Sequence, residues 1–206
     1  MEKNKKLNKF YIFPVLYVLS AYLMFAGLIK GTENPIACLL VLAPFVFGIL
    51  NIVMCVKHCQ PEYYYIMLSS AAIVKYCLVP FFIAGGFLVA GSFISGILLP
   101  IPPMFIVGTF IAFLLCIAGW VILAFGSPYT ISYVVLSQKA GQTSKGMAAF
   151  HIILQFFFTM DVIDIICLSL KAHRNIKSTI AVIILFITAV IAIIALILFI
   201  VFQIVM

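Results

Sequence analysis

Residues Gly146 to Lys177 read GMAAFHIILQFFFTMDVIDIICLSLKAHRNIK, and they form the only long apolar stretch of the chain that contains carboxylates. Asp161 and Asp164 lie within it, and a basic cluster at residues 171–177 closes it. A charged side chain inside a bilayer is costly and marks a functional site by default. The path of this stretch therefore decides both the fold and the place of any charged site.

The composition indicates that lipid, and not water, surrounds most of the chain. Of its 206 residues, 67% are hydrophobic and 8% are charged, whereas soluble domains carry about 25% charged residues. Several uncharged runs reach the roughly 20 residues that cross a hydrocarbon core of about 30 Å. We predict an all-α, polytopic helical membrane protein, folded as a single membrane domain over residues 1–206.

The net charge of +7 does not indicate a nucleic-acid partner. The basic residues lie singly between apolar runs and form no stripe with interleaved aromatic residues. We expect them to orient the helices and to meet the head groups of the lipid bilayer. Four lysines in residues 1–9 predict a cytoplasmic N-terminus.

The uncharged runs place the spans. They lie at about 10–29, 36–56, within 63–99, 104–125 and 180–206. The prolines at Pro100 to Pro103 predict an external loop, and the polar residues 126–146 predict the main cytoplasmic loop. The chain is expected to be a multi-pass protein of the bacterial cytoplasmic membrane.

Lys75 has two interpretations. If a helix covers residues 63–89, Lys75 lies near midspan, close to Pro80, and is a functional-site candidate. If the span instead begins at Tyr76, Lys75 lies at the cytoplasmic interface after a short surface helix. The sequence leaves both open.

Charge bias argues against a membrane crossing by the Asp-containing stretch. If it crosses, seven Lys or Arg lie inside and four outside, with Lys75 set aside; otherwise ten lie inside and one outside. Insertion energy agrees, because thirteen Leu, Ile, Phe and Val contribute about −4 to −8 kcal/mol, whereas two central Asp cost about +5 to +7 kcal/mol.

The local pattern indicates two short helices. Asp161 and Asp164 resemble a cap and a first-turn acid that open a helix over 162–171. His151, Gln155 and Thr159 share one face of a preceding helix. We therefore predict five spans plus a re-entrant or interfacial helix pair at 147–171, with six spans as the alternative.

A carboxylate that enters the bilayer needs a partner. Lys75 is the one intramembrane cation in the sequence, so we expect Asp161, with Asp164 or His151 nearby, to face Lys75 or a water-filled cavity. Such a site would serve a proton or cation step in transport. The structural interpretation is that Asp161 only caps a surface helix, while Asp164 meets head groups or Arg174.

Motifs for catalysis are missing from the sequence. There is no H-E-x-x-H, no G-x-S-x-G and no P-loop, so we expect no enzyme, no catalytic residues and no cofactor. Cys55, His58 and Cys59 supply too few ligands for a closed zinc site, and no metal site is predicted.

Residues 151–171, HIILQFFFTMDVIDIICLSLK, resemble an element of an uncharacterised family of small multi-spanning membrane proteins of low-GC Gram-positive bacteria. The resemblance implies a bacterial membrane location and assigns no activity. The function that we expect is a small transporter component with a charged site near Lys75 and Asp161, acting on an unspecified solute or ion. The alternative is a non-catalytic accessory or scaffold subunit whose membrane protein partner docks at the cytoplasmic face.

The five-span arrangement makes a topological prediction. Because the N-terminus is expected inside and the number of crossings is odd, a reporter fused to the C-terminus should be active only outside the cytoplasm. Paired alkaline phosphatase and green fluorescent protein fusions measure this. A fluorescent, phosphatase-negative cell would support six spans instead.

Overall fold

The computed structural model describes residues 10–30, 35–98, 102–188 and 191. Its contacts divide the chain into two units, Met1–Ile165 and Ile166–Met206. The described residues form helices and no strand, which confirms the all-α prediction. The helices are α2 Ile12–Lys30, α3 Pro35–Lys57, the 3-10 helix η1 Pro61–Tyr63, α4 Tyr64–Leu98, α5 Pro102–Phe125, α6 Pro128–Lys139, α7 Lys145–Leu154 and α8 Met160–Lys171.

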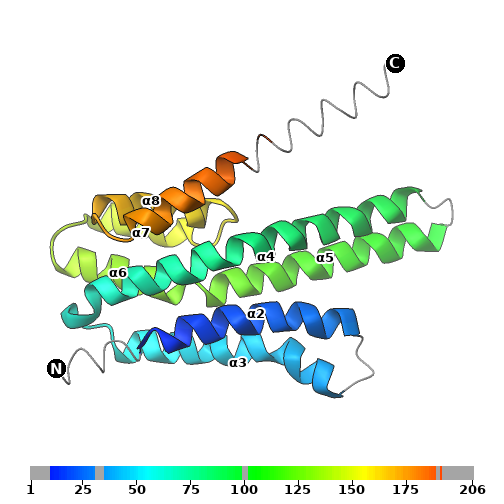
Figure 1. The fold of residues 1–206 in the computed structure, drawn as a ribbon, viewed down its shortest axis with the longest axis horizontal. Helices are drawn as coiled ribbons and strands as arrows, with labels where there is room; N and C mark the ends of the chain where they lie inside the picture. The colour runs from blue at the N-terminus through cyan, green and yellow to red at the C-terminus, as the bar shows by residue number, and fades with distance from the viewer. Residues whose placement is uncertain (1–9, 31–34, 99–101, 189–190, 192–206) are drawn as a thin grey trace. The chain divides into compact units, whose positions relative to one another are not determined.

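The first unit contains two long helical hairpins. Helices α2 and α3 pack along each other, as do α4 and α5, and α2 also packs on α4 (Figure 1). Glycine permits the closest approaches, because a Cβ atom on Gly108 of α5 would lie 2.5 Å from the carbonyl oxygen of Ser92 and 2.9 Å from the Cα atom of Gly96 in α4. The α4–α5 pair is therefore held at backbone contact.

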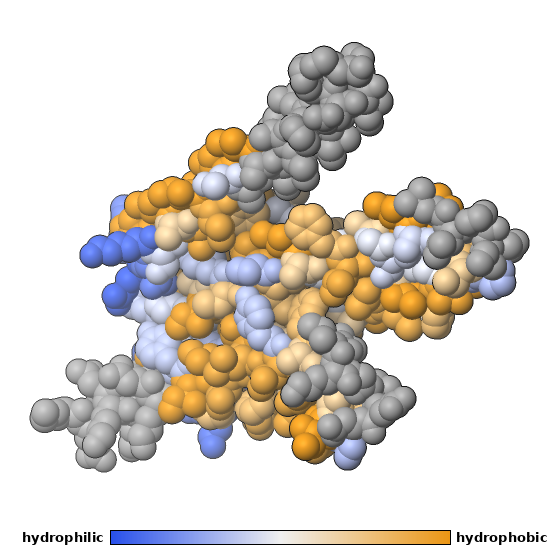
Figure 2. Space-filling view, turned by 45° about the vertical axis from the view of Figure 1, so that its right-hand side comes forward, coloured by the Kyte–Doolittle hydropathy of each residue, from blue (hydrophilic) through white to orange (hydrophobic). Residues whose placement is uncertain are grey.

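The surface of these helices is apolar. By length and composition, three helical stretches could cross a membrane, Pro35–Lys57, Pro61–Ile97 and Pro103–Lys139. Large side chains such as Phe87 and Ile106 are each 69% exposed, and apolar residues cover most of the face in view in Figure 2. This arrangement suits a lipid environment, in which an exposed hydrocarbon side chain costs nothing.

The predicted spans at 10–29 and 36–56 coincide closely with α2 and α3. The predicted span at 180–206 lies mostly outside the described residues. Its beginning belongs to an apolar helix, Ile176–Thr188, of the second unit.

The prediction of a cytoplasmic loop over residues 126–146 is wrong for most of its length. Residues Pro128–Lys139 form α6, in which Tyr129, Thr130 and Tyr133 are buried. Proline is well tolerated in the first turn of a helix, because its missing N–H would have no partner there. The hydroxyl groups that made the stretch look like a loop belong instead to a packed helix.

The predicted loop at Pro100 to Pro103 is also too long. Helix α5 begins at Pro102, so two of the three prolines of this loop stand in its first turn, where proline fits.

No separate surface helix ends before Tyr76, because α4 runs without interruption from Tyr64 to Leu98. The residue at which a membrane span begins within this helix stays a prediction. Lys75 lies inside this helix, about 16 Å from its start at 1.5 Å per residue. Pro80 lies in the same helix. Near it, the hydroxyl of Tyr22 donates a hydrogen bond of 2.7 Å to the carbonyl of Cys77.

The contact between α4 and α5 can be tested with two alanine substitutions. Gly108→Ala should lower the free energy of unfolding by about 1–3 kcal/mol, because the new methyl group meets backbone atoms that cannot move separately. Gly86→Ala is the control, since nothing lies within 4 Å of the position that its methyl group would take, and alanine favours helix. Thermal unfolding in detergent, followed by circular dichroism, measures both. Equal unfolding temperatures would contradict the close contact.

Candidate functional site

Lys75 and Asp161 form a buried ion pair within the first unit. The Nζ atom of Lys75 lies 2.9 Å from Oδ2 of Asp161, and the two side chains are 1% and 2% exposed. Lys75 comes from the interior of α4, and Asp161 from the first turn of α8. The pair therefore joins two helices that are far apart in the sequence.

A third residue completes the surroundings of the lysine. The ammonium group of Lys75 donates a hydrogen bond of 3.1 Å to Oγ of Ser127, just before α6. The Ser127 hydroxyl in turn lies 2.8 Å from the Leu123 carbonyl and 3.2 Å from the Gln155 carbonyl, and donates its hydrogen to one of them. The serine thus links α4 to the end of α7.

Asp164 lies one turn after Asp161 and holds a second polar cluster. Its Oδ1 atom contacts Nδ1 of His151, and its Oδ2 atom accepts a hydrogen bond of 2.6 Å from Nε2 of Gln155. Asp164 stands outside the three candidate spans. Burial raises the pKa of its carboxyl group above the ordinary value, and the bonds from His151 and Gln155 oppose this rise.

A break between α7 and α8 positions these side chains. Helix α7 begins after Ser144, whose side chain accepts a bond from the Met147 amide, and it ends at Leu154. Thr159 then adopts a left-handed conformation with φ of 71°, which is uncommon for a residue with a branched side chain. The chain turns between the two helices, and His151 of α7 meets Asp164 of α8.

Side chains from other helices satisfy the carbonyl groups of this break. The indole of Trp120 in α5 donates a bond of 3.3 Å to the Phe156 carbonyl, and Ser127 lies beside the Gln155 carbonyl. Backbone groups freed at a helix end need such partners when water is excluded. These hydrogen bonds stabilise the break between α7 and α8.

The structure brings together all four residues that the sequence proposes for the charged site, Lys75, Asp161, Asp164 and His151. Ser127 is not among the residues that the sequence predicts for the site, because its segment resembles a loop. The one local feature that could have pointed to Ser127 is its hydroxyl group between Gly126 and Pro128, directly after an apolar run.

Two sequence interpretations near this site are wrong. Asp161 does not precede its helix as a cap, since α8 begins at Met160 and the carboxylate faces Lys75. Thr159 does not continue the face of His151 and Gln155, because α7 ends before it.

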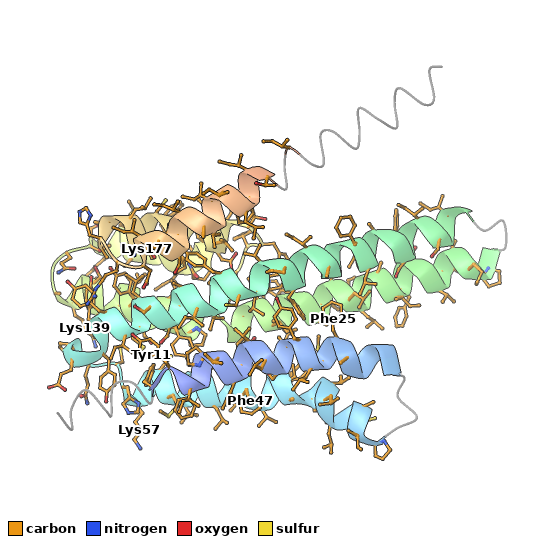
Figure 3. All side chains as sticks on the ribbon, viewed as in Figure 1. Tyr11, Phe25, Phe47, Lys57, Lys139 and Lys177 are labelled. Carbon is orange, nitrogen blue, oxygen red and sulfur yellow. The ribbon has the colours of Figure 1, made fainter. Side chains whose placement is uncertain are left out.

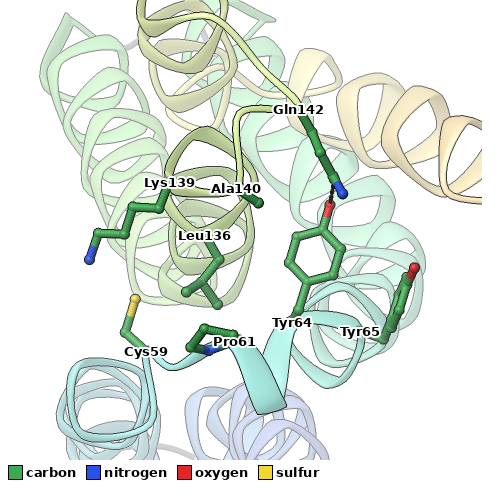
Figure 4. Close-up of a pocket in the computed structure, with 8 residues that line it drawn as sticks. All are labelled: Cys59, Pro61, Tyr64, Tyr65, Leu136, Lys139, Ala140 and Gln142. Carbon is green, nitrogen blue, oxygen red and sulfur yellow. Dashed lines mark hydrogen bonds between the residues drawn. The ribbon is translucent and has the colours of Figure 1, made fainter.

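A separate pocket of about 390 Å³ lies where α4 begins and α6 ends (Figure 4). Tyr64 and Gln142 close one side of it through a hydrogen bond of 2.6 Å. Its lining consists of Cys59, Pro61, Tyr64, Tyr65, Leu136, Lys139, Ala140 and Gln142. None of these residues belongs to the charged cluster, so the pocket and the ion pair are distinct features.

The ion pair predicts a large difference between single and double substitutions. Lys75→Met leaves the buried Asp161 carboxylate without its cation and should lower the free energy of unfolding by about 3–5 kcal/mol. The double variant Lys75→Met/Asp161→Leu removes both charges and should recover most of this loss. Fluorescence of Trp120, the single tryptophan, follows unfolding in detergent.

Lys139→Met is the matched control, because Lys139 is an exposed lysine outside the cluster. It should change stability little. A double variant as unstable as Lys75→Met, or a Lys75→Met protein as stable as the control, would contradict the pairing.

Comparison with known proteins identifies the family. No curated protein and no solved structure matches the chain. A family model matches residues 2–175, which include every residue of the charged cluster. The chain therefore belongs to DUF6652, a family of unknown function.

Proposed function

We propose that the chain is a non-enzymatic component of a transporter in the bacterial cytoplasmic membrane, and that its charged cluster handles a proton or another cation. The observation that carries this proposal is the buried Lys75–Asp161 pair with a second buried carboxylate, Asp164, beside it. Buried charge in a membrane protein is expensive and typical of ion and proton pathways.

The balance of charge supports an exchangeable cation. Lys75 pairs with Asp161, whereas Asp164 contacts the neutral amide of Gln155 and the ionisable ring of His151. A net negative charge in a medium of low dielectric constant favours uptake of a cation. The cluster can therefore gain and lose one positive charge without a change of its framework.

The helix break supports a place for α7 and α8 within the bilayer. With 10 and 12 residues, the helices are about 15 and 18 Å long, too short to cross a core of about 30 Å alone. Broken helices that line ion sites are common in transporters. We propose that the pair enters from the cytoplasmic face, the side on which lysines accumulate.

The position of lysines in the fold agrees with this orientation. Lys57 at the end of α3 and Lys139 at the end of α6 lie at the same end of the first unit, near Tyr11 at the start of α2 (Figure 3). Under the positive-inside rule, this end is the cytoplasmic one.

A second candidate function is that of an accessory subunit. It is favoured by the outer face of α7, where Met147, Phe150 and Ile153 are each more than half exposed. Lipid or a membrane protein partner can cover these side chains. Purification from native membranes in a mild detergent would distinguish the two, since an accessory subunit should bring a larger protein with it in fixed proportion.

Transport can be tested with the purified protein in liposomes. We expect the natural protein to dissipate an imposed proton or sodium gradient faster than empty liposomes do. Asp164→Asn removes the carboxylate that Lys75 does not pair with, and its flux is expected to fall to the level of empty liposomes. The entrapped dye pyranine reports the pH, and a sodium-sensitive dye reports sodium.

Glu62→Gln serves as the control, because it removes a carboxylate that lies in η1, away from the cluster. It should transport at the natural rate. Equal flux in the natural protein and a folded Asp164→Asn protein, or no flux above that of empty liposomes, would refute the proposed function.

A further inference from the structure

The charge of the buried cluster depends on one proton. Among the described residues, the titratable groups around Asp164 are His151 from α7, Lys75 from α4 and Asp161 on its own helix. Lys75 and Asp161 cancel as a pair. What remains is the pair of His151 and Asp164, which is negative when the ring is neutral and neutral when one more proton is bound.

Nitrogen atoms contact three of the four carboxylate oxygen atoms of Asp161 and Asp164. Among the described residues of the cluster, the side-chain oxygen of Gln155 is buried without a hydrogen-bond partner, which leaves too few free oxygens to surround a metal cation. Both oxygens of Asp164 contact nitrogen atoms, one of His151 and one of Gln155. Oδ2 of Asp161 faces the Lys75 ammonium. Sodium and other hard cations need several free oxygen ligands, whereas a proton needs only the hydrogen bond that already exists.

We infer that the ion handled by this site is a proton, exchanged at the hydrogen bond between Nδ1 of His151 and Oδ1 of Asp164. The inference rests on the proposed transport function. Uptake of one proton forms one N–H or O–H bond and makes the pair neutral; release breaks that bond and restores the negative charge. The reaction needs no other reactant.

Exposure indicates the route by which the proton reaches the pair. The side chain of His151 is 12% exposed, whereas that of Asp164 is 2% exposed. Histidine is therefore the member of the pair that meets the surroundings, and it is suited to relay protons near neutral pH. The raised pKa of the buried Asp164 carboxyl group also favours retention of a proton within the pair.

Gln155 connects the proton site to the ion pair. Its side-chain amide donates to Asp164, and its backbone carbonyl lies 3.2 Å from the Ser127 hydroxyl that Lys75 contacts. A proton on Asp164 weakens its attraction for the amide hydrogens of Gln155. The protonation state is thereby communicated, through the helix break, to the surroundings of Lys75.

Nuclear magnetic resonance of protein labelled with nitrogen-15 at histidine tests this inference directly. The chain has three histidines, and His151→Gln assigns the resonances of His151. In lipid nanodiscs between about pH 5 and pH 9, the His151 ring resonances should report proton uptake by its contact with Asp164. Asp164→Asn should change this response to pH, because the neutral amide cannot share a proton with the ring as the carboxylate does.

The resonances of His58 and His173 are internal controls and should not change in Asp164→Asn. Titration of the carboxyl groups in the natural protein, followed by infrared spectroscopy, provides a second measurement that requires no variant. The inference is refuted if His151 titrates identically in Asp164→Asn, or if neither member of the pair titrates in this range. Sodium flux in liposomes without such a titration would refute the proposal that the ion is a proton, but it would agree with the proposed transport function. A coupled titration without any flux would retain the proton site and refute the proposed function.

Discussion

A charged lysine that is buried away from water needs an anion beside it, and for Lys75 this anion is Asp161. The rest of the structure depends on this ion pair. Lys75 lies inside the long helix α4, with almost none of its surface exposed. Its anion, Asp161, belongs to α8, which is separated from α4 by three other helices and a reversal of the chain. Because an unpaired buried charge costs several kcal/mol, this one contact fixes the position of the start of α8 on α4.

The break between α7 and α8 follows from the same requirement. A continuous helix over residues 145–171 would carry His151 and Asp164 more than three turns apart, so they could not share a proton. The left-handed Thr159 reverses the chain and brings them together. The carbonyl groups released by the reversal contact Trp120 and Ser127, side chains of the surrounding helical unit. The contact between His151 and Asp164 and the hydrogen bonds to the backbone carbonyl groups thus both stabilise the break between α7 and α8.

Membership of DUF6652 places the complete cluster within the region that the family model matches. Because the family carries no assigned activity, function has to be argued from the chemistry of the site. The cluster combines the Lys75–Asp161 ion pair with a second contact between His151 and Asp164, and the proposed proton exchange rests on this second contact. The separate pocket at the other end of α6 shares no residue with this cluster.

The sequence by itself determined the helical class, the apolar helices and the identity of the charged residues. Hydrophobic runs and isolated charges record directly whether a segment prefers lipid or water. It also indicated two short helices between residues 147 and 171, because buried acids make a single crossing unfavourable. Only the tertiary structure decided that Lys75 lies within an unbroken helix, that residues 128–139 form a packed helix, and that Ser127 and Gln155 join the cluster. A segment rich in small polar residues is predicted to be a loop when the partners of its hydrogen bonds are unknown. Those partners lie on other helices, far away in the sequence, so no local sequence pattern identifies them.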